Sequence, residues 1–273
     1  MKLSIISDEI SSDLEYAFSV ISKQRYDYVE LRTVFGKNIA MIDDLEIVKI
    51  ENLLKNYALK VSCICSPLFK CLLENKTDLK YDKFLMEDFS PEYHLKIAKR
   101  VFEIAKRLNA KYVRCFSFLD CNDGFELNKK IILGYLKQLK EIFNESDIQL
   151  ILENEHTCNI KTGLDFVNSN IQGIGLLWDP ANSMLAGNHE LENEFCLCKN
   201  QIRYVHVKNF VYDSIGPEFV NLKMGCIDYE KLINLIKTET NAEFISIETH
   251  ANAEMKEKLS SENMKYLMEM CSK

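Results

Sequence analysis

The sequence contains few of the residues that interrupt regular structure. Only 4 prolines and 9 glycines occur among its 273 residues. No linker rich in glycine or serine divides the chain, and charges of both signs are spread along its length. These absences argue against a disordered chain and against a boundary between domains. We therefore expect a single domain over residues 1–273, a length at which barrel proteins commonly form one unit.

Long hydrophobic runs are also missing. No segment approaches the roughly 18 apolar residues that a membrane span needs. The apolar run at Leu3–Ile6 is too short for a signal peptide, and acidic residues follow it at once. The formal net charge of -7 disfavours nucleic acid as a partner. We expect a cytoplasmic protein that binds neither membranes nor nucleic acid; a homo-oligomer is compatible with the sequence.

The ten cysteines lack the spacing of a metal cluster. Cys63 and Cys65 form one C-x-C pair and Cys196 and Cys198 another, while C-x-x-C occurs nowhere. Residues two apart in a strand share a face but need not converge on an ion. We expect scattered, reduced and mostly buried thiols that act as small hydrophobic side chains.

Short apolar runs alternate with longer amphipathic segments along the whole chain. The expected strands are Lys2–Ile6, Tyr28–Leu31, Lys60–Cys65, Tyr112–Phe116, Gln149–Leu152, Gly175–Trp178, Arg203–Val207 and Phe244–Ile247. The expected helices are Asp13–Lys23, Asp44–Tyr57, Pro91–Leu108, Leu127–Asn144, Gly163–Asn168, His189–Lys199, Tyr229–Thr238 and Ala253–Cys271. This alternation predicts parallel strands in an α/β fold. Because no glycine-rich phosphate motif follows a strand, a closed (β/α)8 TIM barrel is favoured over an open sheet.

Two connections are longer than the alternation requires. Residues Pro67–Phe89 follow the third expected strand, and residues Asn209–Ile227 follow the seventh. Long connections in a compact domain often serve as lids or binding loops. Both follow the carboxyl ends of strands, which is the face where barrel enzymes place their sites.

A carboxylate or an imidazole stands at the end of each of the last four expected strands. These residues are Glu153, Asp179, His206 and Glu248. Carboxylates placed directly after apolar strand residues are costly unless they are paired or bind a metal ion. Three carboxylates and one imidazole suit a single divalent ion, with Mn²⁺ or Mg²⁺ favoured and Co²⁺ or Zn²⁺ also suitable. Asp179 alone would equally fit a turn or a helix cap.

These residues also carry a resemblance to a known family. The pattern Glu153-Asn154, Asp179-Pro180-x-Asn182, His206-Val207-Lys208 and Glu248 resembles the sugar phosphate isomerase/epimerase family of xylose-isomerase-like barrels. The upstream segments Asp8–Ser11, Val29–Arg32 and Ser66-Pro67 agree with it, as does Gly225-x-Ile227-Asp228. The resemblance covers Leu3 to about Thr249, and its motifs are specific through their order rather than singly.

The resemblance implies a function as well as a fold. It implies that the four strand-end residues hold one divalent metal ion, and that Glu153 and Glu248 are also the acid/base pair. One would take a proton from the carbon beside a carbonyl and the other would return it, through an enediolate. The expected enzyme is a metal-dependent isomerase or epimerase of a sugar or sugar phosphate, acting on a small polyhydroxylated substrate.

Three further side chains are candidates for substrate binding. Arg32 can clamp a carboxylate, phosphate or hydroxyl, or else form a surface salt bridge with Glu30 or Asp8. Lys208 shares a strand face with His206, or else pairs with a carboxylate at the rim. His156 can contact substrate, orient Glu153 or simply be solvated.

Two residues near the motifs favour a structural role over a catalytic one. Asn182 is expected to cap the helix that follows the sixth strand. Asn209 replaces the Asp that many relatives carry after His-x-Lys, which weakens the case for Lys208 as an acid/base group.

Two other activities compete with isomerisation. A dehydratase acting on a keto-cyclitol or keto-sugar would begin with the same proton abstraction and then expel hydroxide. An endonuclease-IV-like DNA repair enzyme is less favoured, because such enzymes assemble three metals with additional histidines. This chain has five histidines in total, and Asn182 stands where the nuclease pattern has one.

Overall fold

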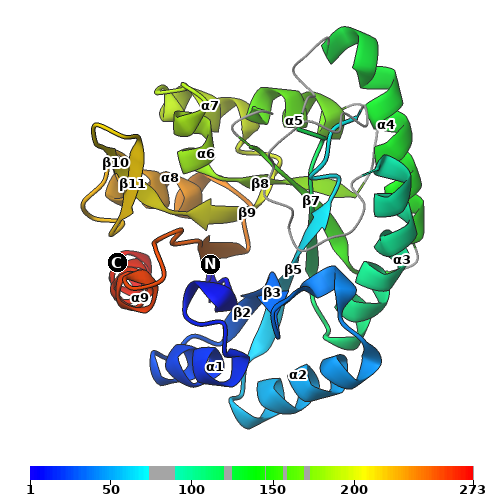
Figure 1. The fold of residues 1–273 in the computed structure, drawn as a ribbon. Helices are drawn as coiled ribbons and strands as arrows, with labels where there is room; N and C mark the ends of the chain where they lie inside the picture. The colour runs from blue at the N-terminus through cyan, green and yellow to red at the C-terminus, as the bar shows by residue number, and fades with distance from the viewer. Residues whose placement is uncertain (74–89, 120–124, 145, 156–158, 169–172, 273) are drawn as a thin grey trace.

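The computed structural model of the chain describes residues 1–73, 90–119, 125–144, 146–155, 159–168 and 173–272. Eight parallel strands form one sheet that curves into a nearly closed barrel, with helices on its outside (Figure 1). The strands lie in the order β1-β12-β9-β8-β7-β6-β5-β2. A bridge between Ile6 and Glu30 brings the two edge strands together. The predicted TIM barrel is confirmed.

The barrel strands match the predicted ones closely. They are β1 (Lys2–Ile5), β2 (Tyr28–Leu31), β5 (Lys60–Leu68), β6 (Tyr112–Cys115), β7 (Gln149–Glu153), β8 (Ile174–Trp178), β9 (Ile202–Val207) and β12 (Phe244–Ile247). The largest difference is in β5, which continues beyond Cys65 to Leu68. Its pairing with β6 shifts register between Ile64 and Leu68, so an irregular stretch prolongs the strand.

The helices form the outer layer. They are α1 (Leu14–Lys23), α2 (Asp44–Asn56), α3 (Pro91–Arg107), α4 (Phe125–Ile142), α5 (Ile160–Asn168), α6 (Pro180–Leu185), α7 (Leu191–Cys198), α8 (Tyr229–Glu239) and α9 (Lys256–Ser272), with short 3₁₀ turns η1 (Ser7–Glu9) and η2 (Ile39–Met41). Ser90 caps α3 as predicted, accepting a 3.2 Å hydrogen bond from the Tyr93 amide. The sequence prediction missed α6, because its six residues are too few to show a helical period.

The alternation of inward-facing and outward-facing side chains along the strands determines where the polar site lies. Inside the barrel, a small apolar cluster takes one residue from each of six strands, with Tyr28 packed against it; its members are Cys63, Tyr112, Ile151, Leu177, Tyr204 and Phe244. Side chains two residues apart share a strand face. The next inward positions toward the carboxyl ends are therefore Glu30, Cys65, Arg114, Glu153, Asp179, His206 and Ser246. The polar site thus lies one layer above an apolar floor.

The two long connections have different outcomes. Most of Pro67–Phe89 lies outside the described residues. The connection Asn209–Ile227 contains an antiparallel hairpin of β10 (Asn209–Tyr212) and β11 (Pro217–Val220). A second small hairpin, β3 (Thr33–Val34) with β4 (Lys37–Asn38), follows β2 and was not predicted.

Two expectations from composition agree with the structure. All the cysteines that it describes are free thiols, and five of them are buried. Within the same residues, no helix is both long enough and apolar enough to cross a membrane.

Candidate active site

The four side chains expected at the strand ends converge at the mouth of the barrel. Glu153, Asp179, His206 and Glu248 are all buried, and each offers a ligand atom within 4.8 Å of the other three. Glu153 ends β7, Asp179 follows β8, His206 lies in β9 and Glu248 follows β12. Three adjacent carboxylates need compensating positive charge, because their mutual repulsion is strong away from water.

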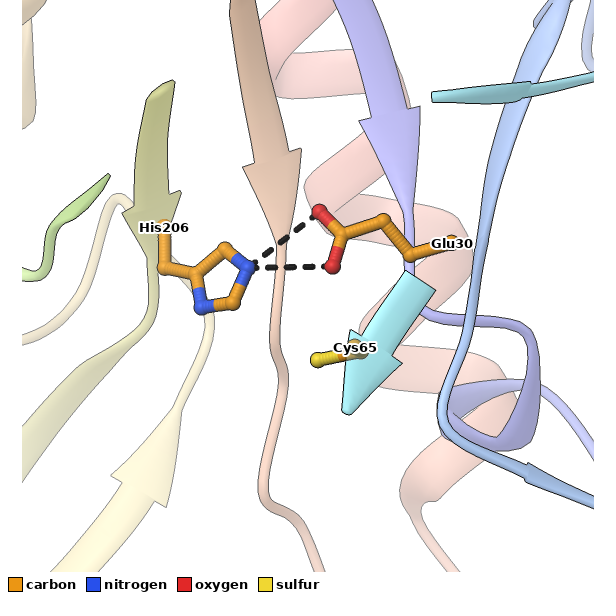
Figure 2. A group of neighbouring side chains, drawn as sticks. All are labelled: Glu30, Cys65 and His206. Atoms are coloured by element: carbon orange, nitrogen blue, oxygen red, sulfur yellow. Dashed lines mark hydrogen bonds and ion pairs between the residues drawn. The ribbon is translucent and has the colours of Figure 1, made fainter. Parts of the chain in front are cut away.

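His206 lies at the centre of this cluster. Its Nδ1 is 3.0 Å from Glu153 Oε1 and 3.7 Å from Glu248 Oε2. Its Nε2 faces the opposite way, toward both carboxylate oxygens of Glu30 (Figure 2). Burial opposes a charged ring, but the carboxylates of Glu30 and Glu153 outweigh it and raise the pKa of His206 to about 10.

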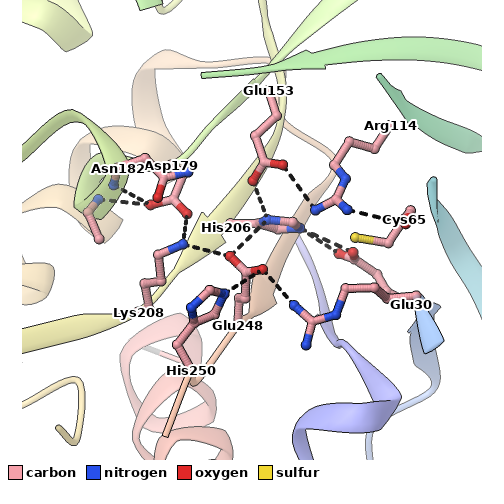
Figure 3. Close-up of polar contacts among 12 residues, drawn as sticks. Glu30, Cys65, Arg114, Glu153, Asp179, Asn182, His206, Lys208, Glu248 and His250 are labelled. Carbon is pink, nitrogen blue, oxygen red and sulfur yellow. Dashed lines mark hydrogen bonds and ion pairs between the residues drawn. The ribbon is translucent and has the colours of Figure 1, made fainter. Parts of the chain in front are cut away.

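Lys208 bridges two of the carboxylates. Its Nζ lies 2.7 Å from Asp179 Oδ2 and 2.7 Å from Glu248 Oε2 (Figure 3). Burial disfavours the ammonium, but these neighbours hold the pKa of Lys208 well above its usual value. Burial raises the pKa of Asp179, with Lys208 opposing the shift. Lys208 therefore supplies part of the positive charge that the cluster requires, and it does point into the site.

Arg32 is held by three acidic residues. Its Nε and Nη2 donate to Asp8 Oδ2 at 3.1 and 2.8 Å, Nη2 also donates to Glu9 Oε1 at 2.5 Å, and Nη1 donates to Glu248 Oε1 at 2.9 Å. The expected alternative partner Asp8 is present, whereas Glu30 faces His206 instead. These bonds use most of the guanidinium donors, so Arg32 orients Glu248 directly.

Besides Glu30, two residues at the site were not found from the sequence. Arg114 on β6 donates from Nη1 to Glu153 Oε2 at 3.0 Å, and it is buried. His250 places its Nε2 3.0 Å from Glu248 Oε1 and has a positive φ of 56°. Left-handed backbone outside glycine is uncommon and collects at functional sites. His156, the third expected substrate contact, lies outside the described residues.

Asn154 and Asn182 form a clasp between β7 and α6. The Asn154 side chain accepts from the Asp179 amide at 2.8 Å and donates to the Asp179 carbonyl at 2.9 Å. In return, Asn182 Nδ2 donates to the Asn154 carbonyl at 2.9 Å. The expectation that Asn182 caps a helix is wrong: Asp179 is the cap, accepting from the Ala181 and Asn182 amides. A helix of six residues begins earlier than the sequence pattern indicated, so Asn182 lies inside it.

Replacing Asn154 by alanine is expected to lower the free energy of unfolding by about 1–3 kcal/mol, because it leaves the buried amide N–H of Asp179 without its partner. Urea unfolding measures the effect. Asn154→Ala combined with Asn182→Ala should cost less than the sum of the single changes, since both break one clasp. Strict additivity, or an unchanged midpoint for Asn154→Ala, would show that the clasp does not stabilise the fold.

Asn209 does not support Lys208 through its side chain. Its amide donates to the carbonyls of Leu222 and Ile227 at 2.7 and 2.9 Å, and its Oδ1 accepts from the Ile227 amide at 3.0 Å. A Cβ on Gly225 would lie 2.1 Å from Asn209 Oδ1, so only glycine fits there. Asn209 thus fastens the chain that leads into α8.

A cavity of about 430 Å³ opens beside the cluster. It is lined by acidic and basic side chains together, which suits a small polar molecule. Its lining includes Arg32, Lys70, Arg114, Glu248, His250 and Lys256.

The donor set fits a divalent cation. It offers three carboxylates and one imidazole nitrogen within 4.8 Å of one another, and oxygen and imidazole donors suit Mg²⁺, Mn²⁺ and Zn²⁺. Asp179 Oδ2 is buried and accepts no well-aligned hydrogen bond among the described residues, although the Lys208 ammonium is near it. Each carboxylate has about four lone-pair directions, so a cation and the basic side chains can share the same carboxylates.

TIM-barrel enzymes carry their active sites at the carboxyl ends of the strands, and the acidic and imidazole cluster of this barrel lies there. The model of the xylose isomerase-like TIM barrel family matches residues 18–270, and the chain belongs to this family. The family resemblance noted in the sequence is confirmed.

Three solved structures illustrate what the fold is similar to. The probable 3-DHS dehydratase AsbF involved in petrobactin synthesis, from Bacillus anthracis, is 16% identical with a TM-score of 0.74, over 98% of this chain and 99% of that one. A xylose isomerase-like TIM barrel protein from Mycobacterium smegmatis in complex with magnesium is 14% identical with a TM-score of 0.71, over 94% and 87%. D-allulose 3-epimerase from Methylomonas sp. is 12% identical with a TM-score of 0.72, over 99% and 98%.

At these identities the likeness concerns the fold alone. Comparison with curated proteins finds none that matches the chain.

Proposed function

We propose that the chain is a divalent-metal-dependent isomerase or epimerase of a sugar or sugar phosphate. The observation that carries this is the buried cluster of Glu153, Asp179, His206 and Glu248 at the barrel mouth. These four would hold the ion, with Mg²⁺ or Mn²⁺ favoured and Co²⁺ or Zn²⁺ also suitable. A structural neighbour is a magnesium complex, and another is an epimerase, which supports the proposal.

The residues of the chain divide the chemistry between them. When bound, the ion polarises the substrate carbonyl and stabilises negative charge that develops on its oxygen. Glu153 and Glu248 exchange a proton with the carbon beside that carbonyl, one as base and the other as acid. Arg114 and Arg32 hold these two carboxylates, and such restraint keeps an acid/base pair in its working geometry.

Lys208 and His250 stabilise the ionised form of Glu248. Both bond it, through Nζ at 2.7 Å and Nε2 at 3.0 Å. Burial would raise the pKa of Glu248, but Lys208, His250 and His206 lower it well below its usual value. Glu248 is therefore ionised and able to accept a proton.

The contacts of Lys208 and His250 with Glu248 favour a dehydratase as the second candidate. Loss of hydroxide after the first proton transfer needs an acid beside the leaving group. The Lys208 ammonium and the His250 ring both lie against Glu248, and His250 also lines the cavity. The fold of a probable dehydratase is similar, at 16% identity.

A three-metal nuclease is not supported by the described residues. Two further groups there could hold an ion, Glu30 with Cys65 and His206, and Glu9 with Glu248 and His250. Each group reuses a residue of the main cluster, so the three cannot be filled independently. Action on a small polyhydroxylated substrate in the cytoplasm, without nucleic acid or membrane, is part of the proposal.

Deuterium exchange tests the proposal. The protein, supplied with Mn²⁺ or Mg²⁺, is incubated in deuterated water with phosphorylated ketoses, free ketoses and keto-cyclitols. We expect solvent deuterium at the carbon beside the carbonyl of at least one class, measured by mass spectrometry and NMR. Water loss in the same assay would identify the dehydratase instead. No exchange in any class would overturn proton transfer as the reaction.

A further inference from the structure

Glu30 is a fully buried carboxylate that the proposed reaction does not use. It lies on β2, 0% exposed, on the inward face that also carries Tyr28. Placing an ionised carboxylate inside a barrel costs several kcal/mol unless it is paired and hydrogen-bonded. A buried partner is therefore needed to offset the cost of burying the Glu30 carboxylate.

That partner is the His206 ring. Nε2 lies 3.2 Å from Glu30 Oε1 and 3.1 Å from Oε2, so both oxygens face one nitrogen (Figure 2). An ionised carboxylate only accepts hydrogen bonds, which means that Nε2 carries the proton. The Tyr204 ring meets the imidazole edge-on, with centroids 5.9 Å apart, and holds its plane from the floor side.

The opposite nitrogen faces the metal-ligand cluster. Nδ1 is 3.0 Å from Glu153 Oε1 and 3.7 Å from Glu248 Oε2. These are separations expected between neighbouring ligands of an ion that binds each at about 2.1 Å. Without a cation, Nδ1 likewise carries a proton toward Glu153. A cation bound among these carboxylates would take the place of that proton, while Nε2 would keep its own proton toward Glu30.

We propose that Glu30 is a positioning residue: it fixes the His206 ring with Nε2 protonated and Nδ1 directed to Glu153 and Glu248, and thereby sets the affinity of the site for a divalent cation. This rests on the proposed function, because it requires that the cluster bind a cation. Partners that orient a histidine ligand typically change metal affinity by about 10- to 100-fold.

In a competing arrangement, the two nitrogens of the His206 ring exchange roles. Glu30, Cys65 and His206 Nε2 could themselves hold an ion, with Nδ1 protonated toward Glu153. The ligand count disfavours it. Nδ1 lies against Glu153 and Glu248, and the main cluster offers three carboxylates in all, whereas the group on the Nε2 side offers one carboxylate and one thiol. A hard divalent cation prefers the richer set of oxygen donors.

Metal affinity measured by calorimetry with Mn²⁺ and Zn²⁺ is the first test. We expect Glu30→Gln to weaken binding by about 10- to 100-fold, and Glu30→Asp to lie between it and the unchanged protein. Cys65→Ala is the matched control, since it alters the same buried place but leaves the Glu30–His206 bonds. It should bind as the unchanged protein does. Equal affinity for Glu30→Gln, or a loss in Cys65→Ala, would overturn the proposal.

The protonated ring nitrogen gives a second readout, which is measured on the unchanged protein. In the Zn²⁺-loaded protein, nitrogen-15 NMR of His206, assigned by loss of its signals in His206→Gln, should show the proton on Nε2 and the metal on Nδ1. The reverse assignment would refute the role of Glu30. Absence of cation binding in the unchanged protein would refute the proposed function itself, so the two failures are distinct.

Discussion

Glu248→Gln is expected to slow proton exchange beside the substrate carbonyl by about 10²- to 10⁴-fold, the usual contribution of a positioned acid or base. Glutamine keeps the shape of the side chain and can still accept the hydrogen bond from Arg32. It cannot take up a proton. The fold should therefore persist while the deuterium-exchange rate falls, and both are measured on the same preparation.

Glu254→Gln is the matched control for this change. It makes the same chemical alteration six residues away, on an exposed side chain after the same strand. We expect its exchange rate to equal that of the unchanged protein. A Glu248→Gln variant that is folded, metal-loaded and fully active would remove Glu248 from the acid/base pair.

Removal of the metal ion should have the second large effect. Dialysis against a chelator is expected to abolish proton exchange, and Mn²⁺ or Mg²⁺ should restore it. The ion should also stabilise the fold, by about 4 kcal/mol when its free concentration is 1,000 times the Kd. The reason is that three crowded carboxylates lose their counter-charge when the ion leaves. Thermal unfolding with and without the ion measures this stabilisation.

Asp179→Asn tests whether the cluster is the site of that stabilisation. We expect it to lose both the restored activity and the rise in Tm, whereas Asp147→Asn, an exposed position, should keep both. If chelation left activity and Tm unchanged, the charge balance would come from Lys208 and the arginines alone.

The fold could be predicted because its signals are local. Strands at Ile174–Trp178 and Phe244–Ile247 are short apolar runs, and Ser90-Pro91 marks the start of α3 without help from the rest of the chain. The hairpin of β10 and β11 could not be predicted in the same way. Its strands are four residues each, half-exposed, and depend on packing such as that of the Phe219 ring against His250, 5.2 Å apart.

The site was predicted from strand ends, and this explains both what was found and what was missed. Acidic residues after an apolar run stand out, as Glu153 and Asp179 do. Glu30 and Arg114 lie within their strands, and a charged residue in a strand is usually interpreted as one whose side chain faces solvent. Counting in steps of two from Tyr28 and Tyr112 would have placed both on the inward face. The bonds of Arg32 to Asp8 and Glu9 join segments whose proximity only the closed barrel reveals.

Crystals of the protein soaked with Mn²⁺ would test the central claim most directly. An anomalous difference map should show one peak among the carboxylates of Glu153, Asp179 and Glu248, within about 2.3 Å of His206 Nδ1. A peak elsewhere, or no peak at a concentration that restores activity, would contradict the proposal that these four side chains form a metal centre.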